Sequence, residues 1–148
     1  MNRIQYLLLI FLLFSNCENN IEDRIPAFQA YVNGAQFWEA SSFAITTDAS
    51  GAIISGNNLS GSILMHIPSL EVGTNDFGSL EISNAVYQDT TYYSTSFNGI
   101  ASIAYLSDGE ITIEEFNSEE NTITGTFNFD AYDETGEYNI NISQGVFY

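Results

Sequence analysis

The chain has 148 residues and a formal net charge of −17, which comes from 19 acidic residues against two arginines and no lysine. A chain with so few cations cannot neutralise a run of phosphates, so the composition excludes nucleic-acid binding. The hydrophobic fraction of 45%, with 11 Phe and 9 Tyr, indicates a folded core and distinguishes the chain from disordered acidic sequences.

The first segment has the pattern of a secretory signal. Arg3 supplies a positive charge, and residues 4–14 form an apolar run. This run is shorter than the roughly 20 residues that a membrane-spanning helix needs. Cys17, the only cysteine, follows directly after Ser15 and Asn16. The ending resembles a lipobox, where the signal is cut before a cysteine whose thiol carries a diacylglycerol.

Two residues depart from the usual lipobox, since Phe14 stands in place of Leu and Asn16 in place of a small residue. Such variation is familiar in lipoproteins of the Bacteroidetes type. The alternative is an ordinary secretory signal followed by a chance cysteine. An unpaired thiol is a liability in an oxidising compartment, and lipidation would remove it. We therefore expect Cys17 to be lipidated and to anchor the protein to a membrane.

The chain is expected to have three parts. Residues 1–16 are the signal peptide, residues 17–25 the lipidated cysteine with an acidic tether, and residues 26–148 a single domain. Removing residues 1–16 removes Arg3 and no acidic residue, so the formal charge changes from −17 to −18. The tether resembles signals for surface export, and a solvated linker is the alternative. The expected location is the cell envelope, lipid-anchored in the outer membrane on its periplasmic or surface face.

The sequence from residue 28 onward alternates apolar and polar residues in short segments, which is typical of β-strands. The strands predicted in the first half are residues 28–32, 35–38, 41–47, 52–60 and 62–67. Asn33 and Gly34 predict a hairpin turn after the first of them, because type I′ turns need positive φ. The middle is less regular: the predictions are a loop at 72–78, a strand at 80–87, and an edge strand or long loop at 90–97.

The last third is patterned more clearly. Residues 100–106 and 110–116 are expected to form a hairpin around 107–109. Ile111 and Ile113 share one face while Phe116 is out of phase, which predicts a β-bulge at Glu114-Glu115. The remaining predicted elements are a turn at 117–121, a strand at 123–131, a turn at 133–136, a strand with Tyr138, Ile140 and Ile142 on one face, and a closing segment at 145–148.

Together these segments predict the fold class. About nine or ten short strands, spaced by roughly 8–12 residues, favour a single all-β domain built as an antiparallel β-sandwich or a barrel. No stretch after Cys17 has a sustained helical period.

Several segments are similar to a family of small uncharacterised Bacteroidetes lipoproteins, grouped as domain of unknown function 6252. The matching residues are 28–34 with Trp38 and Ala40, 54–56, 109–113, 123–129 and 140–147. The resemblance covers most of the mature domain and implies a lipid-anchored all-β domain. It implies no established activity, so no catalytic residue is transferred from it.

The residue inventory leaves few routes to catalysis. Lipidation would remove Cys17 as a nucleophile, and His66, the only histidine, has no nucleophile-elbow sequence beside it. No lysine is present for Schiff-base chemistry, and one His with one Cys cannot form a zinc site. We therefore expect a non-enzymatic protein without catalytic residues or a cofactor. The alternative is a hydrolase, such as a glycoside hydrolase, that uses paired carboxylates.

Acidic residues gather around two of the predicted turns. They are Glu114, Glu115, Glu119, Glu120, Asp130, Asp133, Glu134 and Glu137. Several carboxylates close together suit Ca²⁺, but the spacing is not that of an EF-hand loop. Solvated hairpin turns explain the same pattern without any metal.

Aromatic residues in the irregular middle give the binding hypothesis. The candidates are Tyr87, Tyr92, Tyr93 and Phe97. Exposed tyrosine rings can stack on sugars while their hydroxyl groups form hydrogen bonds. The alternative is that these rings pack in the core or cover a sheet edge, and Trp38 is expected in the core. Thr90 is a candidate for O-glycosylation, because Asp89-Thr90-Thr91 resembles a short Bacteroidetes glycosylation motif.

The expected function is a binding or structural accessory of the cell envelope. The expected partners are the membrane, through the lipid, and a glycan or an envelope protein. A third class, a structural protein that assembles through sheet edges, would require a long unprotected edge strand.

Overall fold

A computed structural model describes residues 27–100 and 105–148, which form strands and turns and contain no helix. Cys17 and the rest of the predicted signal and tether lie outside these residues. The strands are β1 (Phe28–Val32), β2 (Gln36–Glu39), β3 (Ser42–Asp48), β4 (Gly51–Asn58), β5 (Gly61–Ile67), β6 (Gly73–Asp76), β7 (Asn84–Gln88), β8 (Tyr92–Ser94), β9 (Asp108–Asn117), β10 (Thr122–Asp133) and β11 (Asn139–Phe147).

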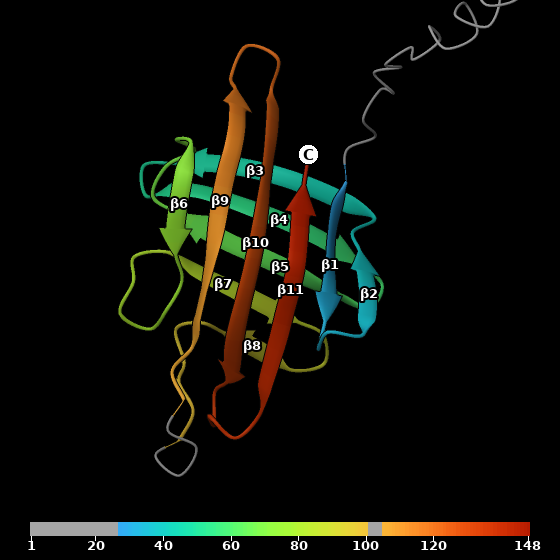
Figure 1. Cartoon of the computed structure of the whole chain (residues 1–148), viewed down its shortest axis with the longest axis vertical. Helices are drawn as coiled ribbons and strands as arrows, with labels where there is room; N and C mark the ends of the chain where they lie inside the picture. The colour runs from blue at the N-terminus through green and yellow to red at the C-terminus, as the bar shows by residue number, and fades with distance from the viewer. Residues whose placement is uncertain (1–26, 101–104) are drawn as a thin grey trace, which may run out of the picture.

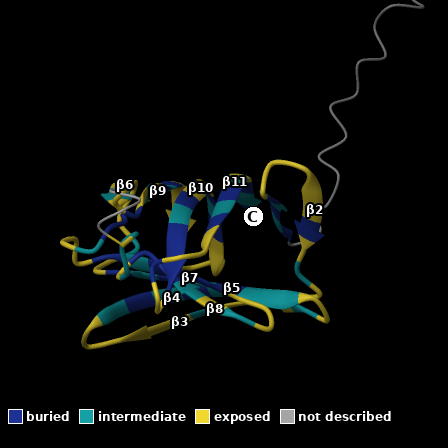
Figure 2. Cartoon of the chain, turned by 90° about the horizontal axis from the view of Figure 1, so that it is seen from below, coloured by how far each residue is buried: buried dark blue, intermediate teal, exposed yellow. Residues whose placement is uncertain are grey.

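All strand pairs are antiparallel and belong to one sheet, which curls into a half-barrel (Figure 1). The main path runs β2-β1-β11-β10-β8-β7-β5-β4-β3, and β6 and β9 extend it from β10. β10 carries the curl: residues Thr122 to Asp130 pair with β9, whereas Tyr132 and Asp133 pair with β8. The strands of one layer therefore cross those of the other (Figures 1 and 2). The predicted all-β antiparallel class is confirmed.

Apolar side chains from both layers meet in one core. Phe28 is in ring contact with Trp38, Phe43 and Phe127, at centroid distances of 5.8, 5.4 and 5.0 Å. Phe28 and Trp38 are almost fully buried, as expected for Trp38. Since Phe28 is on β1 and Phe43 is on β3, this cluster joins the two layers of the half-barrel.

The longest strand confirms the predicted period of two. The buried residues of β10 from Ile123 to Ala131 are Ile123, Gly125, Phe127, Phe129 and Ala131, and the residues that alternate with them are more exposed. The predicted bulge in β9 is also confirmed: Thr124 pairs with Glu115 and Gly125 with Ile113, which leaves Glu114 as the extra residue.

A second bulge, in β11, was not predicted from the sequence. Phe129 pairs with Ile142 but Phe127 pairs with Gly145, so β11 has one extra residue there. Gln144 has a φ of 51° at this point. Ile142 and Phe147 are an odd number of residues apart and would face opposite sides of a regular strand. Because of the bulge, both side chains point into the core and are buried.

Four predictions in the irregular middle and beyond it are wrong, and the first two concern β6 and β8. Residues 73–76, expected in a loop, form β6, which pairs with β9. Residues 92–94 form β8, which lies between β7 and β10 and is therefore neither an edge strand nor a long loop.

The predicted hairpin of 100–106 with 110–116 does not form. Residues 105–107 are not in a strand, and β9 pairs with β6 and β10 instead. Residues 101–104, which belong to that prediction, lie outside the described part. Tyr138, expected on the inner face, precedes β11 and is 64% exposed.

Candidate functional site

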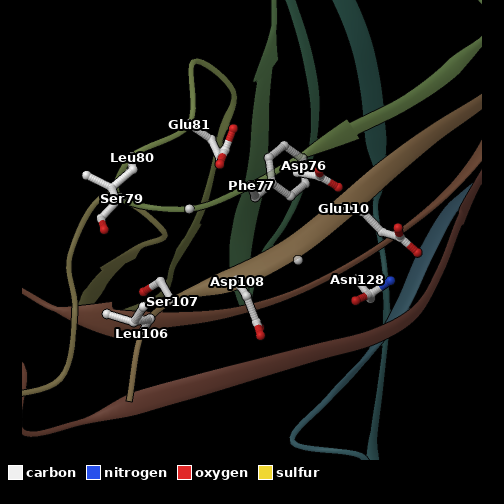
Figure 3. A pocket seen from close by; sticks show the side chains of 12 residues that line it. Asp76, Phe77, Ser79, Leu80, Glu81, Leu106, Ser107, Asp108, Glu110 and Asn128 are labelled. Atoms are coloured by element: carbon white, nitrogen blue, oxygen red, sulfur yellow. The ribbon is translucent and has the colours of Figure 1, made fainter. Parts of the chain in front are cut away.

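A pocket of about 540 Å³ lies beside the end of β6 and the beginning of β9 (Figure 3). The strands contribute Asp76, Asp108, Glu110 and Asn128 to its lining, and the loop after β6 contributes Ser79, Leu80 and Glu81. Ser107 and Leu106 line it from the segment that precedes β9. The volume is in the range of small-ligand sites in proteins.

Hydrogen bonds hold the two loop walls of this pocket together. The Asn98 side chain donates to Ser79 Oγ at 2.7 Å and accepts from the Ser107 amide at 3.0 Å. The Ser107 hydroxyl donates to the Phe97 carbonyl. On the strand side, the Phe77 amide donates to the Gly109 carbonyl at 2.8 Å. The pocket is thus preformed by polar contacts, which favours binding without a large ordering cost.

Gly109 allows the floor of the pocket to form. Its φ is 145°, and a Cβ at this position would overlap the backbone of Asn128 and Phe129. Any other residue would therefore separate β9 from β10 at the point where Asp108 and Glu110 emerge.

Acidic side chains dominate the polar lining of the pocket. Asp76 of β6 is directly opposite Glu110 of β9, and Glu110 is directly opposite Asn128 of β10. Directly opposed residues have Cβ atoms about 4.5–5.5 Å apart, and like charges in this position repel. Both arginines of the chain precede residue 27, so no lysine or arginine in the described residues balances these charges.

Large apolar side chains surround the same pocket and remain in solvent. Leu80 is 94% exposed and Leu106 is 70% exposed. Both line the pocket, while Phe77 lies beneath it, buried against Phe129. Carboxylates and an amide beside exposed leucines allow a ligand to form hydrogen bonds and apolar contacts at once.

The four aromatic residues predicted for binding form two separate pairs. Tyr87 is buried, and its ring lies 6.4 Å from that of half-buried Tyr93. Burial raises the pKa of Tyr87, helped by the nearby Asp89. Tyr92, 46% exposed, contacts Phe97 edge-on at 6.1 Å. The structure therefore presents no single aromatic patch, and none of these rings lines the pocket.

The glycosylation candidate Thr90 is exposed in the turn between β7 and β8. Asp89 Oδ1 accepts from the Thr91 amide at 2.8 Å and fixes this turn. The turn faces the loop between β4 and β5, where Leu59 is fully exposed. The Thr90 hydroxyl donates to Asp89 Oδ1 at 3.5 Å, and its glycosylation stays a prediction.

In the acidic turn after β10, the Asp133 carboxylate is hydrogen-bonded by other residues of the same turn. Asp133 accepts hydrogen bonds from the Thr135 hydroxyl at 2.7 Å and from the Glu137 and Tyr138 amides at 3.1 Å each. In the described residues, no group of three or more His, Cys, Asp or Glu side chains is placed to hold a metal ion. His66 lies on β5 between Ile53 and Asn84 of the adjacent strands.

The pocket residues Asp76, Asp108 and Glu110 were not identified from the sequence as a site. They come from two strands that are far apart in the chain, and the pairing of β6 with β9 brings them together. Asp76 and Glu110 are neighbours only because β6 pairs with β9, a strand more than 30 residues later in the chain. No local motif marks this pairing.

The fold and the pocket define a class of protein, a curled antiparallel β-domain with an acidic pocket between strand ends and the loops beside them. Comparison with protein families places residues 24–148 within Domain of unknown function (DUF6252), so the chain belongs to this family. No curated protein and no solved structure matches the chain. Among the described residues, no helix is long and apolar enough to cross a membrane.

Proposed function

We propose that the protein is a lipid-anchored binding domain of the cell envelope, held by Cys17 in the outer membrane on its periplasmic or surface face. Residues 17–25 then connect the lipid to the domain. The signal-like segment before Cys17 supports the anchor. The protein acts as a non-enzymatic accessory, and its binding site is the pocket beside the end of β6 and the beginning of β9, hereafter the loop pocket.

The position of the pocket relative to the tether supports this arrangement. Ala27 is the first described residue, and it is hydrogen-bonded to Tyr148. In Figure 1 the C-terminal end lies in the upper half of the domain beside β1, while the loop after β6 lies at the left and the segment before β9 at the lower left. An anchored domain would therefore present the pocket on the side away from its membrane attachment.

We propose a neutral or amine-bearing glycan as the ligand of the pocket. The single observation that carries this choice is the row Asp76, Glu110 and Asn128 in one concave, leucine-rimmed pocket. Carboxylate and amide oxygens accept hydrogen bonds from sugar hydroxyls, and these bonds are stronger when the acceptor is ionised. The same charges would repel acidic sugars. An envelope protein is the alternative partner.

Glycan-array screening of the full chain in phosphatidylcholine nanodiscs tests the proposal. We expect neutral or amino-sugar glycans to bind and Glu110→Gln to weaken binding about tenfold, since a charged hydrogen bond is worth about 1.5–3 kcal/mol. Glu114→Gln is the matched control, because Glu114 lies on the same strand but outside the pocket. Equal binding by both variants would contradict the assignment of the pocket.

A glycoside hydrolase is the second candidate function. The pairing of Asp76 with Glu110 favours it, because it brings two carboxyl groups onto neighbouring positions of adjacent strands, and most glycosidases use a pair of carboxyl groups. Incubation of the full chain with the glycans it binds separates the two functions. A hydrolase releases new reducing ends and loses this release in Asp76→Asn, whereas a binding domain releases none.

A further inference from the structure

The sheet has three edge strands in the described residues, and they differ in length. β2 and β6 have 4 residues each, while β3 has 7 and pairs only with β4. At about 3.3 Å per residue, β3 presents an open edge of roughly 23 Å. Proteins usually protect such edges with lysine, proline or a bulge. β3 contains no lysine or proline, and its register with β4 has no bulge.

An apolar groove of about 560 Å³ lies along this open edge. One wall is β3, with Phe43, Ala44, Ile45 and Thr47. The other wall is the end of the β9–β10 hairpin, which extends past β3 at the top of Figure 1 and contributes Phe116 and residues 121–124. Ser118 of the hairpin turn, Leu70 and Tyr148 complete the lining. The groove thus lies between the two layers where the half-barrel remains open.

The groove is continuous with the hydrophobic core. Phe43, Ile45 and Leu70 are partly buried and pack against the core cluster. Phe116 remains 41% exposed on the opposite wall. A strand added to β3 would place alternate side chains against these residues and the others toward solvent. The same groove would therefore supply side-chain pockets as well as a backbone edge.

Acidic residues adjoin the lining residues of the groove in three segments of the chain. Asp48 follows Thr47, Glu71 follows Leu70, and Glu119 and Glu120 form the hairpin turn between the lining residues Ser118 and Asn121. No lysine or arginine occurs in the described residues. A second copy of this chain would bring the same charges to the same edge, so charge complementarity favours a basic partner.

We propose that β3 and the groove bind an extended segment of a partner protein, apolar at alternate positions and flanked by lysine or arginine. The segment pairs with β3 as an additional strand, its apolar side chains enter the groove, and its cations lie beside Glu119 and Glu120. This site is separate from the loop pocket, and it does not depend on the glycan proposal.

A synthetic peptide with alternating Val and Thr between two lysine pairs, labelled with a fluorophore, tests the inference by anisotropy. The full chain is held in phosphatidylcholine nanodiscs, and empty nanodiscs serve as the blank. We expect saturable binding that weakens as salt is added. The same peptide with alternate backbone amides N-methylated should not bind, because it cannot pair with a strand. A glutamate-flanked peptide should bind at least tenfold more weakly.

Matched variants assign the binding to the groove. Phe116→Ser should weaken binding about tenfold, while Phe37→Ser, which removes an exposed ring of β2 outside the groove, should change it less than twofold. Glu119→Gln with Glu120→Gln should weaken binding several-fold at low salt. The control pair is Glu134→Gln with Glu137→Gln, in the turn at the other end of β10. Thermal melting confirms that each variant is folded.

Equal affinity of the parent peptide and the N-methylated or glutamate-flanked peptide would overturn the inference. So would the absence of parent-peptide binding at 1 mM, or occupation of the groove by palmitate alone. Sedimentation of the full chain supplies the remaining test. A dimer that Phe116→Ser dissociates would identify a second copy as the occupant and contradict a basic partner.

Discussion

Ala27 and Tyr148 exchange two backbone hydrogen bonds, from the Ala27 amide to the Tyr148 carbonyl at 2.9 Å and from the Tyr148 amide to the Ala27 carbonyl at 3.0 Å. They extend the pairing of β1 with β11 by one residue pair beyond Phe28 and Phe147. The segment before residue 27 therefore joins the domain beside Tyr148, which also lines the groove along β3. A lipid at Cys17 would tether the domain by this end.

Replacing Cys17 tests the proposed anchor. Cys17→Ser removes the thiol that would carry the lipid, so the variant should move from the membrane fraction to the soluble fraction. Acyl chains contribute about 0.8 kcal/mol per buried CH₂, and two or more chains are needed for stable anchoring. Membrane fractionation without detergent measures the change. Ser15→Ala is the control that keeps the cysteine, and a membrane-bound Cys17→Ser would exclude the lipid anchor.

The aromatic cluster around Phe28 should dominate the stability of the domain. Phe28→Ala removes the ring that contacts Trp38, Phe43 and Phe127, and we expect a loss of about 3–5 kcal/mol in the free energy of unfolding. Phe37→Ala removes a 53% exposed ring and should cost under about 1 kcal/mol. Urea unfolding compares the two, and equal losses would show that the core lies elsewhere.

Local patterns predicted the parts of this fold that have strong alternation. β10 alternates without interruption over Ile123 to Ala131, and its pattern specifies the buried face. The bulge at Glu114 was detectable because Phe116 leaves the phase set by Ile111 and Ile113. In each case the residues of a single strand were enough to predict the feature.

The errors occur where pairing depends on distant residues. β6 is Gly73 to Asp76, which contains no large apolar residue, so only its partner β9 makes it a strand. Tyr92 to Ser94 resembled an edge strand because its residues are polar, yet the curl of the sheet places it between β7 and β10. Since the loop pocket is built on the pairing of β6 with β9, it was not predictable from local sequence.

Gly125 should tolerate no side chain. It lies on the buried face of β10, and an added Cβ would overlap the Phe147 ring and the Thr112 carbonyl. We expect Gly125→Ala to destabilise the domain by about 1–3 kcal/mol through overpacking. The matched control is Gly78→Ala, where a Cβ would meet only ordinary contacts at 3.4 and 3.5 Å. Thermal melting distinguishes them, and an unchanged Tm for Gly125→Ala would contradict the close approach of β10 and β11.

Asp133 should make the stability of the domain depend on acidic pH. The Thr135 hydroxyl holds the pKa of this carboxyl below its usual value of 3.8, with help from the Tyr138 and Glu137 amides and against the effect of burial. The folded state therefore binds the proton more weakly than the unfolded state. The carboxylate stabilises the fold fully above the unfolded pKa of about 4, and this contribution is lost as pH falls through the depressed folded pKa.

Substitution of Asp133 by asparagine keeps an oxygen acceptor and removes the titration. We expect Asp133→Asn to lower the Tm at pH 7 and to reduce the loss of stability between about pH 5 and pH 2, relative to the unmodified chain. Glu134→Gln, in the same turn and exposed, should leave both quantities close to their original values. Urea unfolding at a series of pH values measures the slopes. If the free energy of unfolding changes with pH equally for Asp133→Asn and the unmodified chain, the hydrogen bonds of the turn do not lower the pKa of Asp133.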